Sequence, residues 1–167
     1  EQVPLGNYHG TSINYVTPFE AIKEKLPNAE VTYSIGSPIA TGFPLLNPIP
    51  SDYLSSDGKA GLTGKYYANM DWAGEPAMTQ QDAELNFKWT QKTPVTGVMA
   101  DTFAVQWKGQ LIVPERGTYR LGLKACNFGR FTLNDSTYFE FDNVHHPITR
   151  YIDLDLKKGE SYNIAID

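Results

Sequence analysis

The stretch that decides the fold is Phe103-Ala104-Val105-Gln106-Trp107-Lys108-Gly109-Gln110-Leu111-Ile112-Val113. Its large apolar side chains fall at alternate positions, and Gln106, Lys108 and Gln110 fall between them. Successive side chains of a strand point to opposite faces, so this period of two predicts a β-strand with one buried face.

Similar segments lie on both sides of this stretch. Each carries alternating apolar residues and is bounded by a turn, such as the one at Pro114–Gly117 or at Lys158-Gly159. The remaining expected strands carry Leu85, Phe87 and Trp89; Tyr119, Leu121 and Leu123; Phe131 and Leu133; Ile152, Leu154 and Leu156; Tyr162, Ile164 and Ile166. Many short strands without a helical period predict a mainly β domain, an antiparallel β-sandwich, over residues 61–167.

Residues 1–40 follow a different pattern, that of a short strand–helix–strand α/β fragment. Thr17 as N-cap, Pro18 in the first turn and Glu20 three residues after the cap form a capping box, which predicts a helix from Thr17 to Leu26 that Pro27 ends. A strand is expected over Val31–Ile35. Because so small a unit cannot bury its own apolar face, we expect the helix to dock on the β domain or on a neighbouring molecule.

The two parts are joined by a linker expected over residues 41–60, which is rich in Pro, Gly and Ser. Phe43, Leu45, Leu46 and Ile49 give this linker apolar side chains to bury, so we expect it to be ordered.

Composition excludes several classes of function. The 167 residues carry a net charge of −5, whereas a nucleic-acid-binding face needs clustered Lys and Arg. No apolar run reaches the roughly 20 residues that span a bilayer. Cys126 is the single cysteine, which excludes an internal disulfide and a multi-cysteine metal site. We therefore expect neither a nucleic-acid nor a membrane partner.

Four motifs of the β region occur in an order and spacing that resemble the PA14 domain, a protective-antigen-like β-sandwich. They are Leu62-Thr63-Gly64-Lys65-Tyr66-Tyr67, Asp101–Gly109, Pro114-x-x-Gly117-Thr118-Tyr119 and Gly129–Asp135. The resemblance covers Gly61 to Asp167, and it implies that the module lacks its last strand.

The N-terminal part resembles the sandwich domain of family-three glycoside hydrolases. The motifs are Gly6-Asn7-Tyr8-His9-Gly10, the helix that begins at Val16-Thr17-Pro18, and the following strand. In β-glucosidases and β-xylosidases of one branch of that family, a PA14 module is inserted after this strand. The resemblance implies a fragment of a larger, retaining β-glycosidase, with the other catalytic domains as partners, an oligosaccharide substrate, and a periplasmic or extracellular location.

No residue of this chain matches a catalytic position of that family, so we expect the isolated chain to be inactive. Retaining glycosidases need two carboxylates about 5–5.5 Å apart. Asp153 and Asp155 are the nearest candidates, but their alternation with apolar residues predicts a solvent-facing strand surface. We expect no cofactor, because Cys126 and Asn127 stand where related modules carry the Asp-Asp pair that binds calcium, and a thiol is a poor calcium ligand.

Carbohydrate contact is the chemistry left for this chain to supply. The candidate residues are Asp71, Trp72, Asn127, Arg130 and His145. Exposed aromatic rings stack on sugars, yet Trp72 also fits a residue that closes one end of the sandwich, and Arg130 fits a solvated strand residue. His145-His146-Pro147 fits loop architecture better than a metal site, since adjacent residues of an extended chain point apart.

Three functional hypotheses stay open at this point. The first is an accessory domain of a family-three β-glycosidase that shapes substrate access. The second is a freestanding carbohydrate-binding or adhesion module, and the third is a structural insertion without a ligand.

Overall fold

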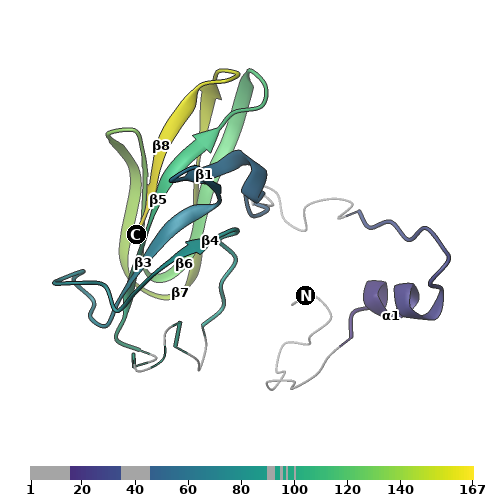
Figure 1. Cartoon of the computed structure of the whole chain (residues 1–167), viewed down its shortest axis with the longest axis horizontal. Coiled ribbons are helices and arrows are strands. Elements are labelled where there is room, and N and C mark those ends of the chain that lie inside the picture. The colour runs from purple at the N-terminus through teal and green to yellow at the C-terminus, as the bar shows by residue number, and fades with distance from the viewer. Residues whose placement is uncertain (1–15, 35–45, 90–92, 95, 97, 100) are drawn as a thin grey trace. The chain divides into compact units, whose positions relative to one another are not determined.

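The computed structural model describes residues 16–34, 46–89, 93, 94, 96, 98, 99 and 101–167. The chain divides into two compact units, Glu1–Leu45 and Leu46–Asp167. Helix α1 lies in the first unit, and strands β1 to β8 lie in the second (Figure 1).

Helix α1 (Pro18–Lys25) begins with the predicted capping box. The Glu20 backbone N–H donates to Thr17 Oγ1 (3.2 Å), and the Thr17 N–H donates to Glu20 Oε2 (2.9 Å). These hydrogen bonds lower the pKa of the exposed Glu20 carboxyl. None of the residues of α1 is buried, and Ile22 is 48% exposed. The helix is therefore confirmed, and its docking stays a prediction.

The strand expected over Val31–Ile35 is not found in its described part. Residues 31–34 have the alternating pattern of a strand, but the structure forms no strand there. A β-strand requires a hydrogen-bonded neighbour, and a single segment cannot supply one. Ile35 and the strand expected before Thr17 fall outside the described residues.

The second unit is a single curved antiparallel sheet in the order β2-β1-β5-β8-β6-β7, with β3 pairing to β4 and to β5 (Figure 1). The strands are β1 (Leu54–Ser56), β2 (Lys59–Ala60), β3 (Leu62–Tyr67), β4 (Met78–Asp82), β5 (Ala104–Ile112), β6 (Gly117–Leu133), β7 (Ser136–Leu156) and β8 (Ser161–Ile166). The mainly β, antiparallel fold class is confirmed. Strand β5, which lies within the stretch that decided the fold, pairs with β1, β3 and β8.

The later part of the expected linker belongs to the sheet. After a short 3₁₀ turn (Ser51–Tyr53), β1 and β2 form a hairpin across Asp57-Gly58, whose φ angles are 51° and 74°. Two positive φ angles in a two-residue loop define a type I′ turn, for which Asp-Gly is a preferred sequence. Ile49 packs on the core, as expected of an ordered linker, whereas Phe43 and Leu45 fall outside the described residues.

The segment with Leu85, Phe87 and Trp89 is not a strand, which corrects the prediction for residues 85–89. Residues 84–89 belong to no strand; the strand in this part of the chain is β4, which sequence analysis did not identify. The aromatic side chains of residues 84–89 are instead held by ring stacking: Phe87 lies parallel to Trp107, with centroids 5.6 Å apart. Alternation therefore reflected the packing of aromatic rings rather than backbone pairing.

The core of the sheet contains one buried carboxylate, that of Asp82 at the end of β4, which is 6% exposed. Asp82 Oδ2 accepts hydrogen bonds from the Tyr66 hydroxyl (2.6 Å) and from Trp107 Nε1–H (2.8 Å), and Oδ1 accepts from Gln80 Nε2 (2.7 Å). An added Cβ at Gly64 would overlap Asp82 Oδ2. Glycine at residue 64 thus leaves room for a carboxylate that joins β3, β4 and β5.

Removal of this carboxylate tests its structural role. We expect Asp82→Ala to lower the free energy of unfolding by about 2–4 kcal/mol, because two buried donors, the Tyr66 hydroxyl and Trp107 Nε1–H, lose their acceptor. Exposed Glu75 is the matched control, and Glu75→Ala should change stability by less than about 0.5 kcal/mol. Denaturant unfolding measures both, and equal stability of the two variants would contradict the assignment.

The Tyr66 hydroxyl gives this network a pH dependence. Burial, followed by the hydrogen bond to Asp82, raises the pKa of Tyr66 above its ordinary value of 10.0. A raised pKa favours the folded state while the hydroxyl is protonated, so this contribution is complete below pH 10.0 and is lost as the pH rises above that value. As the pH rises above 10.0, the free energy of unfolding should fall more in the wild-type chain than in Tyr66→Phe. Equal decreases in the two proteins would refute the buried hydrogen bond of the Tyr66 hydroxyl as the cause.

Candidate functional site

The turn between β3 and β4 carries Trp72 in an unusual backbone conformation. Trp72 has a φ of 55°, which is uncommon for a bulky residue. The Asn69 side chain closes the turn: its Nδ2 donates to Ala73 O (2.8 Å) and its Oδ1 accepts from Ala73 N–H (3.2 Å). Strained conformations persist where the surroundings hold them, so this turn is built to present the Trp72 ring in one orientation.

The Trp72 ring lies on side chains of β6. It meets Phe128 edge to face, with centroids 5.3 Å apart and planes at 64°. The Arg130 guanidinium lies over both rings, 5.9 Å from the Trp72 centroid and 5.3 Å from the Phe128 centroid. Trp72 Nε1–H reaches the Val105 carbonyl at 3.5 Å. We call Trp72, Phe128 and Arg130 the Trp72 cluster; all three are half-buried.

A hydrogen-bond network of Glu140, Asp167 and Gln106 holds the arginine of the Trp72 cluster in place. Arg130 Nε donates to Glu140 Oε2 (2.6 Å) and Nη1 to Asp167 Oδ2 (3.2 Å), while Asp167 Oδ1 accepts from Gln106 Nε2 (2.6 Å). The hydrogen bond to Glu140, with Asp167 contributing, raises the pKa of Arg130. Arg130 is a strand residue, as expected, and its guanidinium is held in a hydrogen-bond network by Glu140 and Asp167.

The other three predicted residues border the Trp72 cluster by position. Asp71 is exposed and precedes Trp72, and Asn127 is exposed and precedes Phe128, with a φ of 71°. Asn127 pairs with Val144, so the exposed His145 is next to that pair along β7. The structure therefore joins Trp72 and Arg130 by contact, and it places His145 one residue beyond the register partner of Asn127.

The segment His145-His146-Pro147, which was expected to form a loop, lies within strand β7. Asn127 lies within β6, where the pairing with β7 is irregular. The register shifts between Ala125 and Asn127 and again between Asn127 and Gly129. Such bulges re-aim side chains without ending a strand, which explains why the pattern suggested loops.

Phe128, Glu140, Asp167 and Gln106 were missed by sequence analysis. Phe128 carried a signal, because an aromatic residue at that position departs from the alternation of Leu121, Leu123, Phe131 and Leu133. The polar partners carried none, since their contacts join residues up to 61 positions apart.

Cys126 and Asn127 do not fit a calcium site. Calcium needs six to eight oxygen ligands, and here an exposed thiol contacts the single amide oxygen of Asn127 (3.6 Å). Across the residues that the structure describes, no three His, Cys, Asp or Glu side chains are grouped as metal ligands.

Asp153 and Asp155 lie on the exposed face of β7, as alternation predicted. Arg120 forms two hydrogen bonds with Asp153 (2.7 and 2.6 Å), which lower the pKa of that carboxyl. Asp155 Oδ1 accepts from the Thr118 hydroxyl (2.6 Å). Each carboxylate is therefore engaged by a neighbour on β6, an arrangement of surface pairs.

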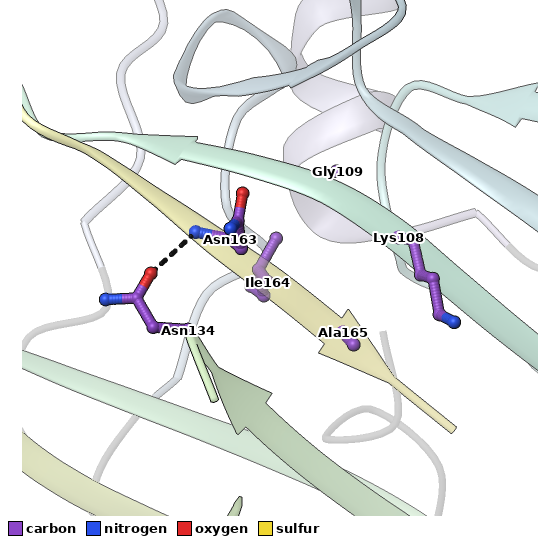
Figure 2. A pocket seen from close by; sticks show the side chains of 6 residues that line it. All are labelled: Lys108, Gly109, Asn134, Asn163, Ile164 and Ala165. Carbon is purple, nitrogen blue, oxygen red and sulfur yellow. Dashed lines mark hydrogen bonds between the residues drawn. The ribbon is translucent and has the colours of Figure 1, made fainter. Parts of the chain in front are cut away.

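A shallow depression of about 240 Å³ lies over β5 and β8. Figure 2 shows its lining residues, Lys108, Gly109, Asn134, Asn163, Ile164 and Ala165. Asn134 Oδ1 accepts from the Asn163 backbone N–H (3.0 Å), which fixes the β6–β7 turn against β8 (Figure 2). The depression has no aromatic side chain, so it lacks the stacking surface of the Trp72 cluster.

Within the described part of the chain, the helix is too short and polar to cross a membrane.

Comparison with known proteins gives similarities over the whole chain and over its second unit. The chain is 22% identical to a xylan 1,4-beta-xylosidase of Xylanibacter ruminicola over 99% of its length and 19% of the xylosidase. It is similar to a beta-glucosidase of Kluyveromyces marxianus solved with glucose (26% identity, TM-score 0.55), over 97% of this chain and 20% of that one. The chain thus spans about a fifth of either protein.

Another solved structure, an anti-sigma factor domain-containing protein, is 24% identical with a TM-score of 0.60, over 64% of this chain and 37% of that protein. It supports the fold of the β unit alone. Residues 58–167, which include β2 to β8 and therefore most of the sheet and the entire Trp72 cluster, match the PA14 domain. The chain belongs to the PA14 domain family.

Proposed function

We propose that this chain is the PA14 module, with the segment that precedes it, of a family-three glycoside hydrolase that removes terminal β-linked glucose or xylose by a retaining mechanism. The extent of the similarity carries this proposal. The xylosidase and the β-glucosidase align over nearly the whole chain, and so include residues before the PA14 match begins at residue 58. A module on its own would align only over the PA14 domain.

The Trp72 cluster is the surface that we assign to substrate. Aromatic rings and planar polar side chains are the groups that bind sugars, through C–H contacts and hydrogen bonds to hydroxyls. Trp72 is half-buried, and Asp71, Asn127 and His145 are exposed. These residues would contact sugar units beyond the one that is cleaved, and so set the preferred length of the oligosaccharide.

The chemical step would come from the remaining domains of the parent enzyme. The described carboxylates near one another on β7, Asp153 and Asp155, are engaged by Arg120 and Thr118. The isolated chain would therefore bind or guide sugar without hydrolysing it.

A freestanding carbohydrate-binding or adhesion module is the second candidate. The anti-sigma factor domain-containing protein favours it, because the β unit occurs there in a protein of another description. Under this hypothesis residues 1–45 would need a different role, which makes it the weaker candidate.

Trp72→Ala in the parent enzyme tests the assigned surface. We expect kcat/KM for an aryl β-glycoside to stay unchanged, because that substrate has no sugar beyond the bond that is cleaved. The ratio of kcat/KM for a tetrasaccharide to that for a disaccharide should change by about tenfold or more, since roughly 1.4 kcal/mol of contact energy is removed.

Tyr138→Ala is the matched control, because Tyr138 is an aromatic residue of β7 that is 39% exposed and outside the Trp72 cluster. An unchanged chain-length ratio in Trp72→Ala would reject the proposed role and would favour an insertion that binds no substrate.

Calcium should not be required for this function. Cys126 and Asn127 offer one thiol and one amide where calcium needs several oxygens. We expect the melting temperature of the chain to be the same in millimolar calcium and in EDTA. A calcium-dependent rise in melting temperature that Asn127→Ala abolishes would contradict this expectation.

A further inference from the structure

The second unit carries another aromatic surface, distinct from the Trp72 cluster. It consists of Phe87, which is 41% exposed, and of Trp89 and Trp107, with which Phe87 stacks. We call these three residues the Phe87 shelf. It lies on the segment after β4 and on β5, whereas the Trp72 cluster lies on the β3–β4 turn and on β6.

The ring distances determine which face of Phe87 is open. The Phe87 centroid lies 4.8 Å from that of Trp89 and 5.6 Å from that of Trp107, and all planes are within 13° of parallel. Parallel rings in contact are separated by about 3.5 Å, so a Phe87 placed between the two indoles would hold them about 7 Å apart. Their centroids are 6.2 Å apart. Both indoles therefore lie on one side of Phe87, and its other face is directed away from them.

The two indoles on which Phe87 stacks are held in place by three other side chains, those of Asp82, Tyr66 and Phe103. Trp107 is 8% exposed, and its Nε1–H donates to the buried Asp82 carboxylate (2.8 Å). Tyr66 meets both indoles edge to face, at 6.3 Å from Trp89 and 6.1 Å from Trp107. Phe103 meets Trp89 in the same way at 5.2 Å. A ring on such a floor is pre-oriented, so a ligand would not have to order it.

The surroundings of Phe87 limit what can occupy its open face. Asn86 and Lys88 are exposed polar neighbours, and Asn86 Nδ2 donates to Glu84 Oε1 (3.2 Å). One exposed phenyl ring offers an apolar face far smaller than the 1,200–2,000 Å² or so that a stable protein interface buries. A flat apolar face of this size, on a segment that also carries exposed amide, carboxylate and ammonium groups, matches a single pyranose ring and its hydroxyls.

We propose that the Phe87 shelf is a second sugar-binding site, which stacks one neutral pyranose ring with equatorial hydroxyls on the open face of Phe87. Equatorial hydroxyls leave axial C–H groups on the sugar faces, and these groups contact the ring. The site does not depend on the Trp72 cluster, so the chain would hold a glycan at two separate positions.

The test is calorimetric titration of the 167-residue chain with xylohexaose and with cellohexaose. In a Trp72→Ala background, which removes the indole of the Trp72 cluster, saturable binding of at least one of the two should remain. Phe87→Tyr keeps a flat ring and should preserve affinity. Phe87→Leu keeps apolar volume but not a flat face, and it should weaken binding by about tenfold or more.

The control Tyr138→Ala removes a ring of similar exposure that is tilted by 42° on Phe131, and it should leave affinity unchanged. Quenching of indole fluorescence on sugar binding should also disappear in Phe87→Leu, because Trp89 lies directly beneath Phe87. Two results would overturn the proposal: equal affinity of Phe87→Leu and the Trp72→Ala background, or no binding of either hexasaccharide in that background. Both leave the role of Trp72 in the parent enzyme untouched.

Discussion

The buried carboxylate of Asp82 is the interaction on which the β unit depends. It joins β4 to β3 through the Tyr66 hydroxyl and to β5 through the Trp107 indole, and Gly64 leaves the space that it fills. A buried charge is tolerated only where its acceptors are satisfied, and here three donors converge on it. The same carboxylate orients Trp107, so it also fixes the floor of the Phe87 shelf.

Sequence pattern was sufficient where local chemistry dictates structure. The capping box of Thr17 and Glu20 and the alternation along β5 needed no knowledge of distant residues. The type I′ turn at Asp57-Gly58 carried an equally local signal, which was overlooked. Pairing was harder to predict: the alternating apolar residues near Phe87 indicated a strand, but these side chains stack on Trp107 while the backbone of residues 84–89 joins no ladder.

The candidate site shows the same division. Trp72 and Arg130 could be selected as residue types suited to sugar contact. Their contact with each other and with Phe128 could not be predicted, because it depends on the β3–β4 turn packing against β6. The bulges around Asn127 could not be inferred from the alternation of apolar and polar residues. Each bulge shifts the pairing of β6 with β7, but the residues that form it do not stand out in the sequence. Fold and family could therefore be predicted from sequence, whereas the hydrogen-bond network of Arg130 became visible only in the structure.

The chain belongs to the PA14 family and is similar to two glycosidases over nearly its whole length. Both findings support a carbohydrate-related role for the Trp72 cluster and the Phe87 shelf. Under the proposed function, the β unit presents aromatic side chains to a glycan that another domain cleaves. The most direct measurement is a crystal structure of the parent enzyme, with its nucleophile removed, bound to a β-linked tetrasaccharide. The account predicts that Trp72 and Phe128 contact a sugar ring beyond the scissile bond. Sugar density that ends in the catalytic pocket, with the Trp72 cluster facing solvent away from it, would contradict the account.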